Sequence, residues 1–248
     1  MPTYNEKDRL GELVEALFGS ASADGVALEL IIVDDNSPDG TGQIADALAR
    51  THRIHVVHRS GKLGLGTAVV AGFGVASSDV VGVMDADFSH PPSLVPRMMA
   101  VFRDTDADVL VASRYVPGGS TPNWPLKRRL LSRLGCFLAR GLSPIRDAAS
   151  GFFLIRRDIA RGVAIKAGGF KILIELIVRG GPGRLVEVPY QFDDRELGES
   201  KMSMREAAGY LVQLKDLYRV RATTRRRTPT YRRFTARDVE RISTYRSR

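Results

Sequence analysis

Hydrophobic residues over the first 115 positions alternate between two spacings, one typical of helices and the other of buried strands. The first helical pattern places apolar residues at i, i+3, i+4, i+7 and i+8, namely at Leu10, Leu13, Val14, Leu17 and Phe18. A continuous apolar run then covers residues 28–33 and ends abruptly in two aspartates. The first pattern predicts a helix with one apolar face, and the second predicts a buried strand.

Ser37, Pro38 and Asp39 follow that strand and predict a helix start, with Ser37 as N-cap, Pro38 at the first helical position and Asp39 in the first turn. Later patterns predict strands at 54–57, 80–84 and 109–112, and helices at 67–76 and 93–102. The strands show no polar alternation, which is typical of a mostly parallel sheet with helices on both faces. Ligands of such α/β folds bind beyond the carboxyl ends of the strands. Four acids stand there: Asp34, Asp35, Asp85 and Asp87.

The second half of the chain is less regular. Its patterns predict strands at 152–155 and 185–188, and helices at 126–142 (strongly basic), 171–178 and 205–220. The segment 221–248 has few large aliphatic residues, so we expect it to be exposed or loosely ordered. We therefore expect one catalytic domain over residues 1–220 and a basic, loosely ordered tail over 221–248.

Composition excludes several classes of protein. The 248 residues are 44% hydrophobic and 26% charged, which is ordinary for a globular protein. Cys136 is the single cysteine, so no disulfide forms within the chain, and a reducing compartment suits it. No run in the sequence approaches the roughly 20 apolar residues needed to cross a bilayer. We therefore do not expect an integral membrane protein.

The net charge is concentrated at one end. Of the +9 carried by the chain, the segment 221–248 contributes +8, through ten arginines against Asp238 and Glu240, and this leaves +1 for the rest. Such a segment suits an anionic partner, either nucleic acid or a membrane surface, and a solvated tail with no binding role is an equally good interpretation. We expect no nucleic-acid partner, because the body is nearly neutral and shows no zinc pattern or aromatic RNA-binding motif.

Asp85, Ala86 and Asp87 follow the strand predicted at 80–84. Residues i and i+2 of an extended chain point the same way, so both carboxylates face one site. Hard oxygen donors suit Mg²⁺ or Mn²⁺. Two solvated acids at the start of a loop are an equally good interpretation of this triplet alone.

Two more segments lie near strand ends: Pro2-Thr3-Tyr4-Asn5-Glu6 and the run from Val33 to Thr41. Together with the Asp85 triplet, they resemble the nucleotide-sugar half of family 2 glycosyltransferases. A narrower resemblance, to the dolichyl-phosphate mannose synthases of that family, covers residues 1 to about 220. It rests on Gly64-Leu65-Gly66-Thr67-Ala68, His90-Pro91-Pro92, Ser113-Arg114-Tyr115, the run from Trp124 to Ser132, Ser150-Gly151-Phe152, Phe170-Lys171 with Glu175, and the loop from Arg195 to Lys201.

The resemblance implies a GT-A, Rossmann-like α/β fold. It also implies transfer of mannose from GDP-mannose to dolichyl or polyprenyl phosphate. Transfer of another sugar, such as glucose from UDP-glucose, to the same lipid stays open. The acceptor phosphate is already anionic, so we expect no essential general base, and direct displacement inverts the anomeric centre.

By position, the resemblance also implies site residues. The nucleotide base and ribose would contact Pro2, Tyr4, Glu6, Val33 and Asp35. Asp85, Ala86 and Asp87 would meet the ribose, the diphosphate and the metal, with Asp87 and Asp85 as ligands of Mg²⁺ or Mn²⁺. Arg114, Arg195 and Lys201 would bind donor phosphates, and Arg114, Arg128 and Ser132 the acceptor phosphate. The residues expected to be catalytic are Asp87, Arg114 and Arg128. Ser89 stands where some relatives carry a glutamine ligand, and it is left out of the metal set.

Other residues have simpler interpretations. We expect His90 to be a loop residue and Cys136 to be inert packing. For the lipid acceptor we expect peripheral attachment to the cytoplasmic face of a membrane, through the basic tail, the helix at 126–142 or a hydrophobic partner subunit. Relatives carry an apolar strand just before the Pro-Thr-Tyr-Asn-Glu segment, whereas only Met1 precedes Pro2 here. We therefore expect further residues upstream.

Overall fold

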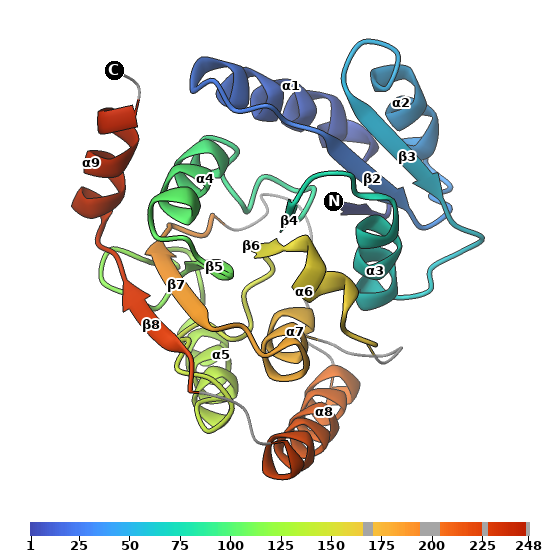
Figure 1. Ribbon diagram of the computed structural model, residues 1–248. Coiled ribbons are helices and arrows are strands. Elements are labelled where there is room, and N and C mark those ends of the chain that lie inside the picture. Colours follow the sequence, from blue (N-terminus) through green and yellow to red (C-terminus); the bar gives the residue numbers. More distant parts are fainter. Residues whose placement is uncertain (166–170, 194–203, 225–227, 247–248) are drawn as a thin grey trace.

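The computed structural model describes residues 1–165, 171–193, 204–224 and 228–246 (Figure 1). The strands are β1 (Pro2–Thr3), β2 (Leu30–Asp34), β3 (Ile54–His58), β4 (Val80–Val83), β5 (Val109–Ser113), β6 (Phe153–Arg156), β7 (Arg184–Pro189) and β8 (Thr230–Arg233). The helices are α1 (Lys7–Ala23), α2 (Thr41–Leu48), α3 (Leu65–Val75), α4 (Leu94–Asp104), α5 (Leu126–Leu138), α6 (Arg157–Arg161), α7 (Ile172–Gly180), α8 (Met204–Thr223) and α9 (Ala236–Arg246).

The strands form two sheets. The smaller has the order β1-β2-β3 and is parallel throughout. The larger has the order β4-β6-β5-β7-β8, in which only β6 runs antiparallel to its neighbours. The predicted α/β class with a mostly parallel sheet is confirmed, and β6 is its antiparallel member.

Helices cover both faces of the larger sheet because its central strands are apolar on both sides. Leu110 of β5 packs into one hydrophobic cluster with residues of α1 and α4. Its neighbours Val109 and Val111 pack into another cluster, with residues of α3 and α7. Successive side chains of a strand point to opposite faces, so the absence of polar alternation in the sequence reflects burial on both faces.

Helix α2 begins later than the sequence predicts. The sequence places its N-cap at Ser37, but α2 begins at Thr41 and its N-cap is Gly40, whose φ is 97°. The Ser37 hydroxyl donates instead to Oδ1 of Asp34 over 2.6 Å. That bond holds residues 35–40 as a loop over the end of β2.

Residues 228–246, which the sequence predicts to be loosely ordered, form a strand and a helix instead. Strand β8 pairs in parallel with β7, and α9 packs along α4. Only two fully apolar side chains, Phe234 and Val239, are buried here, and both join the cluster that contains α1 and α4. A few well-placed apolar residues thus order a segment whose composition is otherwise polar. In the part of the chain that the structure describes, no helix combines the length and hydropathy needed to span a bilayer.

We predict that Phe234→Ala lowers the free energy of unfolding by about 3 kcal/mol, because it leaves a cavity between α9, β7 and α4. The exposed neighbour Arg237 provides the control, and Arg237→Ala should change stability by less than about 0.5 kcal/mol. Urea unfolding of the three proteins measures both values. Equal stability of all three would show that the segment after residue 224 contributes nothing to the core.

Candidate active site

The predicted donor residues lie on the loops that follow β1 and β2. Hydrogen bonds join these two loops: the backbone N–H of Asn5 donates to Oγ of Ser37 over 3.1 Å, and that of Glu6 donates to Oγ1 of Thr41 over 2.9 Å. Asn5 and Asn36 both have positive φ, near 60°, which asparagine tolerates better than most residues. The loops therefore form one rigid wall at the carboxyl ends of β1 and β2.

Within this wall, Val33 and Asp35 are buried, while Pro2, Tyr4 and Glu6 are partly exposed. Nη1 of Arg59 lies 2.8 Å from Oδ1 of Asp35, and both side chains are buried. The contact is not aligned as a hydrogen bond, which leaves Oδ1 of Asp35 with unused acceptor capacity. Burial raises the pKa of Asp35, and the nearby Arg59 opposes that shift. A buried acceptor in this position is suited to a hydroxyl or amino donor of a bound nucleoside.

The Asp85 loop follows β4. The backbone N–H of Asp85 donates to Nδ1 of His90 over 2.9 Å, and the carboxylate of Asp85 remains 37% exposed. Oδ1 of Asp87 accepts from both the N–H and the hydroxyl of Ser89, at 3.1 and 2.5 Å. Burial lowers the pKa of His90, so this imidazole is neutral and fixes the loop as a hydrogen-bond acceptor. His90 is a loop residue, as predicted, with this structural role in addition.

The carboxylates of Asp85 and Asp87 could supply part of the ligand set of a divalent cation. Among the described residues, no group of three His, Cys, Asp or Glu side chains forms a complete metal site. Mg²⁺ usually takes one or two protein carboxylates and completes its octahedron with substrate phosphates and water. The exposed carboxylate of Asp85, next to the buried one of Asp87, matches that partial donor set.

Arg114 follows β5 and is fixed by a buried carboxylate. Its Nε and Nη2 donate to the two oxygens of Asp147 over 2.8 and 2.7 Å, and its backbone N–H donates to Asp147 over 3.0 Å. Nη1 takes no part in this pair, and within the described residues no hydrogen bond is seen for it, so it can serve a second anion. Although burial alone would lower the pKa of Arg114, the Asp147 charge more than compensates, and the net pKa is raised.

Asp147 is positioned in turn by Glu187 of β7. The Glu187 carboxylate is fully buried and accepts from the backbone N–H groups of Arg146 and Asp147, at 2.8 and 3.0 Å. Tyr231 of β8 also donates its hydroxyl to Glu187. Burial raises the pKa of Glu187. Strand β8 thus supports the site indirectly, because Tyr231 binds Glu187, Glu187 binds the backbone of Asp147, and Asp147 binds Arg114.

Trp124 brings the two predicted acceptor arginines together. The guanidinium carbon of Arg128 lies 4.0 Å from the centre of the indole ring, and that of Arg114 lies 5.2 Å from it. The indole Nε1 is buried without a hydrogen-bond partner. Ser132, one turn after Arg128 on α5, accepts from the hydroxyl of Tyr115 over 2.6 Å. Two guanidinium groups beside one indole ring are residue types suited to an anion such as a phosphate.

Aromatic contacts connect this cation pair to the Asp85 loop. His90 stacks on Phe152 at 4.8 Å and meets the ring edge of Phe192 at 6.0 Å, and Phe192 lies 5.3 Å from Trp124. The structure therefore brings Asp85, Ala86, Asp87, Arg114, Arg128 and Ser132 into one region. Arg195 and Lys201, the other two predicted phosphate ligands, lie outside the described residues, so their roles stay predictions.

Three residues of this region are not apparent from the sequence: Asp147, Glu187 and the partly buried Lys171. Burial lowers the pKa of Lys171, and so does the neighbouring charge of Arg114. A signal existed for Lys171, which lies in a segment that carried the family resemblance, but none existed for Asp147, 33 residues from its partner. Cys136 is buried and its pKa is raised to about 12 by burial, which agrees with the expected role in packing.

The family described as Glycosyl transferase family 2 matches residues 1–164. The chain is similar to the dolichol-phosphate mannosyltransferase of Pyrococcus furiosus, with 39% identity. The match covers 85% of this chain but only 60% of the length of that protein. It is also 40% identical to the polyprenol monophosphomannose synthase of Mycolicibacterium smegmatis, over 84% of this chain and 82% of that protein.

One solved structure with the same fold is glucosyl-3-phosphoglycerate synthase from Mycobacterium tuberculosis, in complex with Mn²⁺, UDP-glucose and phosphoglyceric acid. The TM-score is 0.63 at 17% identity, and the match covers 92% of this chain and 85% of that one. At this identity the likeness concerns the fold, and it agrees with the GT-A, Rossmann-like architecture.

Proposed function

The chain belongs to glycosyltransferase family 2, and we propose that it transfers mannose from GDP-mannose to dolichyl or polyprenyl phosphate. The printed names of the Pyrococcus and Mycolicibacterium relatives support this acceptor class and this sugar. The single observation in the structure that carries the proposal is the pair of arginines around Trp124.

The arginine pair suits a phosphate acceptor on α5. A guanidinium is planar, stays charged, and offers parallel donors that match phosphate oxygens. Arg114 keeps Nη1 outside its ion pair with Asp147, and Arg128 faces the same indole. The Ser132 hydroxyl accepts from Tyr115 and keeps its own proton to donate. Together these groups can neutralise the acceptor phosphate where it must approach the donor diphosphate.

The donor would occupy the wall formed by the loops after β1 and β2, with its nucleoside against Tyr4, Glu6 and Asp35. Its diphosphate would reach Asp85 and Asp87, which would hold Mg²⁺ or Mn²⁺. When bound, that cation neutralises charge on the leaving diphosphate. Arg195 and Lys201 would add cations at the diphosphate.

The chemistry needs charge compensation more than proton transfer. A phosphate monoester is largely dianionic near neutral pH, with a second pKa of about 6, so its oxygen attacks without a general base. At a few ångströms in a low-dielectric site, repulsion between acceptor phosphate and donor diphosphate would be prohibitive without cations. In-line attack on an α-linked donor gives a β-linked lipid product. Asp87, Arg114 and Arg128 are the residues on which transfer would depend.

Transfer of glucose from UDP-glucose is the alternative within the same chemistry, and the Mycobacterium structure with UDP-glucose shows that the fold accommodates that donor. Discrimination between sugars depends on hydroxyl contacts in the pocket. The names of the relatives favour mannose.

We predict that the chain transfers sugar from GDP-mannose, and not from UDP-glucose, to polyprenyl phosphate, and that excess EDTA abolishes the transfer until Mg²⁺ or Mn²⁺ is restored. Radiolabelled nucleotide sugars and extraction of the lipid product measure both effects, and NMR of the product should show a β-linkage. Transfer only from another donor would overturn the mannose assignment. Full activity in EDTA would show that transfer needs no metal, and an α-linked product would show that transfer is not a direct displacement.

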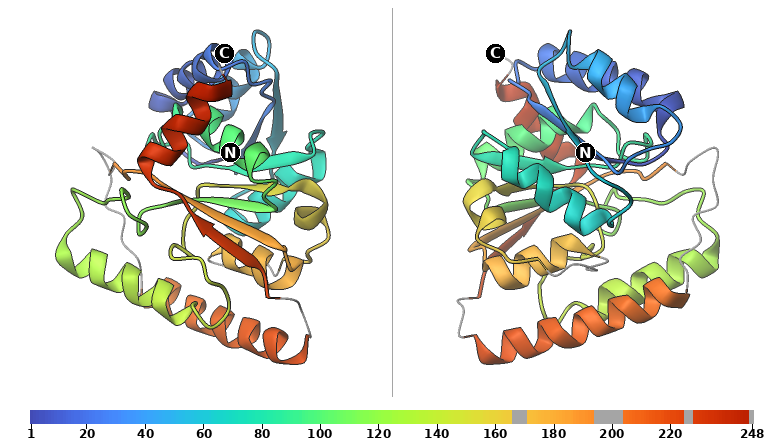
Figure 2. Two further views of the ribbon diagram at one scale, coloured as in Figure 1. Left: turned by 60° about the vertical axis from the view of Figure 1, so that its left-hand side comes forward. Right: turned by 90° about the vertical axis from the view of Figure 1, so that its right-hand side faces the viewer.

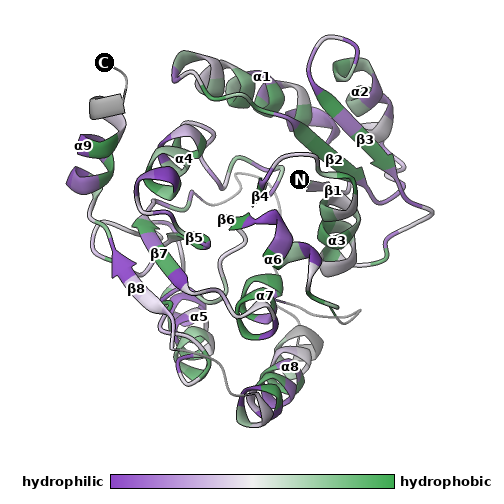
Figure 3. Ribbon diagram, viewed as in Figure 1, coloured by the Kyte–Doolittle hydropathy of each residue, from purple (hydrophilic) through white to green (hydrophobic). Residues whose placement is uncertain are grey.

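We also propose that helices α5 and α8 form the membrane-facing edge. They lie side by side along one edge of the molecule (Figure 2), where Tyr210 and Tyr218 of α8 donate to backbone carbonyls of α5. Both helices carry hydrophobic as well as hydrophilic residues (Figure 3). The exposed large hydrophobic residues on them are Leu126, Leu130, Leu131, Leu134, Phe137 and Leu138 on α5, and Leu211, Val212 and Tyr218 on α8.

This edge has the character of an interfacial amphipathic surface, because α5 also carries Lys127, Arg129 and Arg133. Insertion of its apolar residues would place Arg128 and Ser132, on the same helix, at the level of lipid phosphates. We propose peripheral attachment to the cytoplasmic face through this edge, with the basic segment after residue 220 adding attraction to anionic lipid. A hydrophobic partner subunit remains part of this proposal.

We predict that the double variant Leu130→Glu/Leu134→Glu reduces co-sedimentation with anionic liposomes at least tenfold, because it puts two charges into the inserted face. Val75→Glu on α3, which also replaces an exposed apolar residue, is the matched control and should bind normally. Binding of the parent chain should weaken with salt. Equal loss in both variants, or no loss in either, would show that α5 is not the membrane-facing element.

A further inference from the structure

The loop between β3 and α3, residues 59–64, borders the wall formed by the loops after β1 and β2. The backbone N–H of Arg59 donates to the carbonyl of Asp34 over 2.9 Å, and Nη2 of Arg59 donates to Oγ1 of Thr67 over 2.6 Å. Gly64 ends the loop with a φ of 100°, a conformation that glycine adopts without strain. The loop is therefore fixed against the end of β2.

Lys62 of this loop lies over an aromatic ring of the wall. Its Nζ stands 4.1 Å from the centre of the Tyr4 ring. Lys62 is exposed and Tyr4 is partly exposed, and in the described part of the chain no carboxylate forms an ion pair with this ammonium. A lysine stem is flexible, and its contact with an aromatic ring is weak at an exposed position. A flat ligand that stacks on Tyr4 can therefore displace the ammonium from the ring face.

A hydrogen-bond acceptor stands next to this cation. Oδ1 of Asp35 is buried without an aligned hydrogen bond, although Nη1 of Arg59 lies 2.8 Å away. Burial raises the pKa of Asp35, and the charge of Arg59 opposes that shift. The backbone N–H groups of Leu63 and Gly64 oppose it as well, so both lie close to the carboxylate. Since Leu63 directly follows Lys62, the ammonium and the carboxylate border the same part of the wall.

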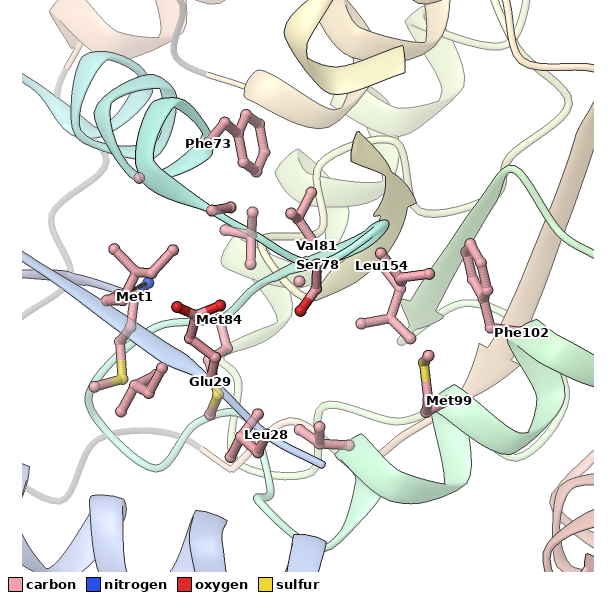
Figure 4. Close-up of a pocket in the computed structure, with 18 of the residues that line it drawn as sticks. Met1, Leu28, Glu29, Phe73, Ser78, Val81, Met84, Met99, Phe102 and Leu154 are labelled. Atoms are coloured by element: carbon pink, nitrogen blue, oxygen red, sulfur yellow. Dashed lines mark hydrogen bonds between the residues drawn. The ribbon is translucent and has the colours of Figure 1, made fainter. Parts of the chain in front are cut away.

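A cavity of about 650 Å³ between β2 and β4 is another hollow near the wall. Figure 4 shows that apolar side chains such as Phe73, Met84 and Leu154 line it. Tyr4 and Lys62 are not part of its lining. Polar groups that enter an apolar cavity lose their hydrogen bonds to water, so the edge of a nucleobase is better matched by the wall.

Guanine is the base whose edge matches a carboxylate beside an ammonium. Its O6 and N7 are acceptors, and its N1–H and 2-amino group are donors on the adjoining edge. Adenine carries an amino group at position 6, and its N1 has no proton, so both polarities are reversed. Uracil offers one carbonyl and one N–H at these places and no amino group. The pair therefore satisfies guanine and leaves unpaired or repelled groups on the other two bases.

We propose that Lys62 contacts the base of the donor and that, together with Asp35, it selects guanine nucleotides. The base stacks on Tyr4 in place of the ammonium, which moves to the base edge and donates to O6 and N7. Asp35 accepts from N1–H and the 2-amino group. A site built for these hydrogen bonds rejects a base that lacks them, because its own buried acceptor then stays unpaired. The inference rests on the proposed function only in that the ligand of the wall is a nucleotide.

The test is binding of GDP, ADP and UDP in the presence of Mg²⁺, measured by calorimetry without any acceptor. The proteins are the parent chain, Lys62→Met, Lys62→Arg and Lys7→Met. Lys62→Met keeps an unbranched stem without the charge, and Lys62→Arg keeps a cation with N–H donors. Lys7 is exposed at the start of α1, so Lys7→Met controls for the loss of one positive charge near the wall. GDP and ADP both stack a purine, and the ratio of their affinities therefore measures recognition of the base edge.

We expect the parent chain to bind GDP more tightly than ADP by about 100-fold or more, and more tightly than UDP by about tenfold or more. Lys62→Met should reduce the ratio of GDP to ADP affinity by about tenfold or more, because it removes the donor to O6 and N7. Lys62→Arg should retain most of the ratio, and Lys7→Met should leave it unchanged.

ADP or UDP binding as tight as that of GDP in the parent chain would overturn the proposal. An unchanged ratio in Lys62→Met, or equal losses in Lys62→Met and Lys7→Met, would overturn it as well. Guanine selection that depends on Lys62, without any transfer to polyprenyl phosphate, would refute the proposed function and support this inference. Transfer from GDP-mannose together with an unchanged ratio in Lys62→Met would do the reverse.

Discussion

The site depends on one buried ion pair, between Arg114 and Asp147. An isolated buried charge costs several kcal/mol, so Arg114 can stand at the end of β5 only because Asp147 binds it through two side-chain bonds. Asp147 is itself fixed by Glu187, and Glu187 by Tyr231 of β8. These contacts link β8 to the Arg114 guanidinium, which we propose binds the acceptor phosphate. The Arg114 guanidinium is therefore oriented before any substrate binds.

That preorganisation matches what sugar transfer to a lipid phosphate requires. Donor and acceptor both bring phosphate groups, and the repulsion between them must be reduced before a bond can form. In the proposed function, Arg114 and Arg128 beside Trp124 would bring positive charge to the acceptor phosphate, while Asp85 and Asp87 would hold a cation at the donor diphosphate. Because the donors are held in place before reaction, little reorganisation remains to be done in the transition state.

The sequence alone predicts the helices and strands from α1 to β5, because their hydrophobic periodicity is local, but it does not predict the two-residue strand β1. It also predicts the acids at the ends of β2 and β4, since a strand end is visible where an apolar run stops. It could not predict Asp147 or Glu187, whose roles come from contacts 33 and 40 residues away. Nor could it predict α9, which is ordered by tertiary contacts of Phe234 and Val239 against an otherwise polar composition. Ser37 has the residue type of an N-cap but bonds to Asp34, because the loop closes back on β2.

The central claim is that Arg114 and Arg128 together bind the acceptor phosphate. Its most direct test is the Michaelis constant for polyprenyl phosphate, and separately for the nucleotide sugar, in Arg128→Ala and in the exposed neighbour variant Lys127→Ala. The account predicts at least a tenfold rise in the acceptor constant for Arg128→Ala, an unchanged donor constant, and parent-like values for Lys127→Ala. A rise in the donor constant alone, or equal effects of the two variants, would contradict it.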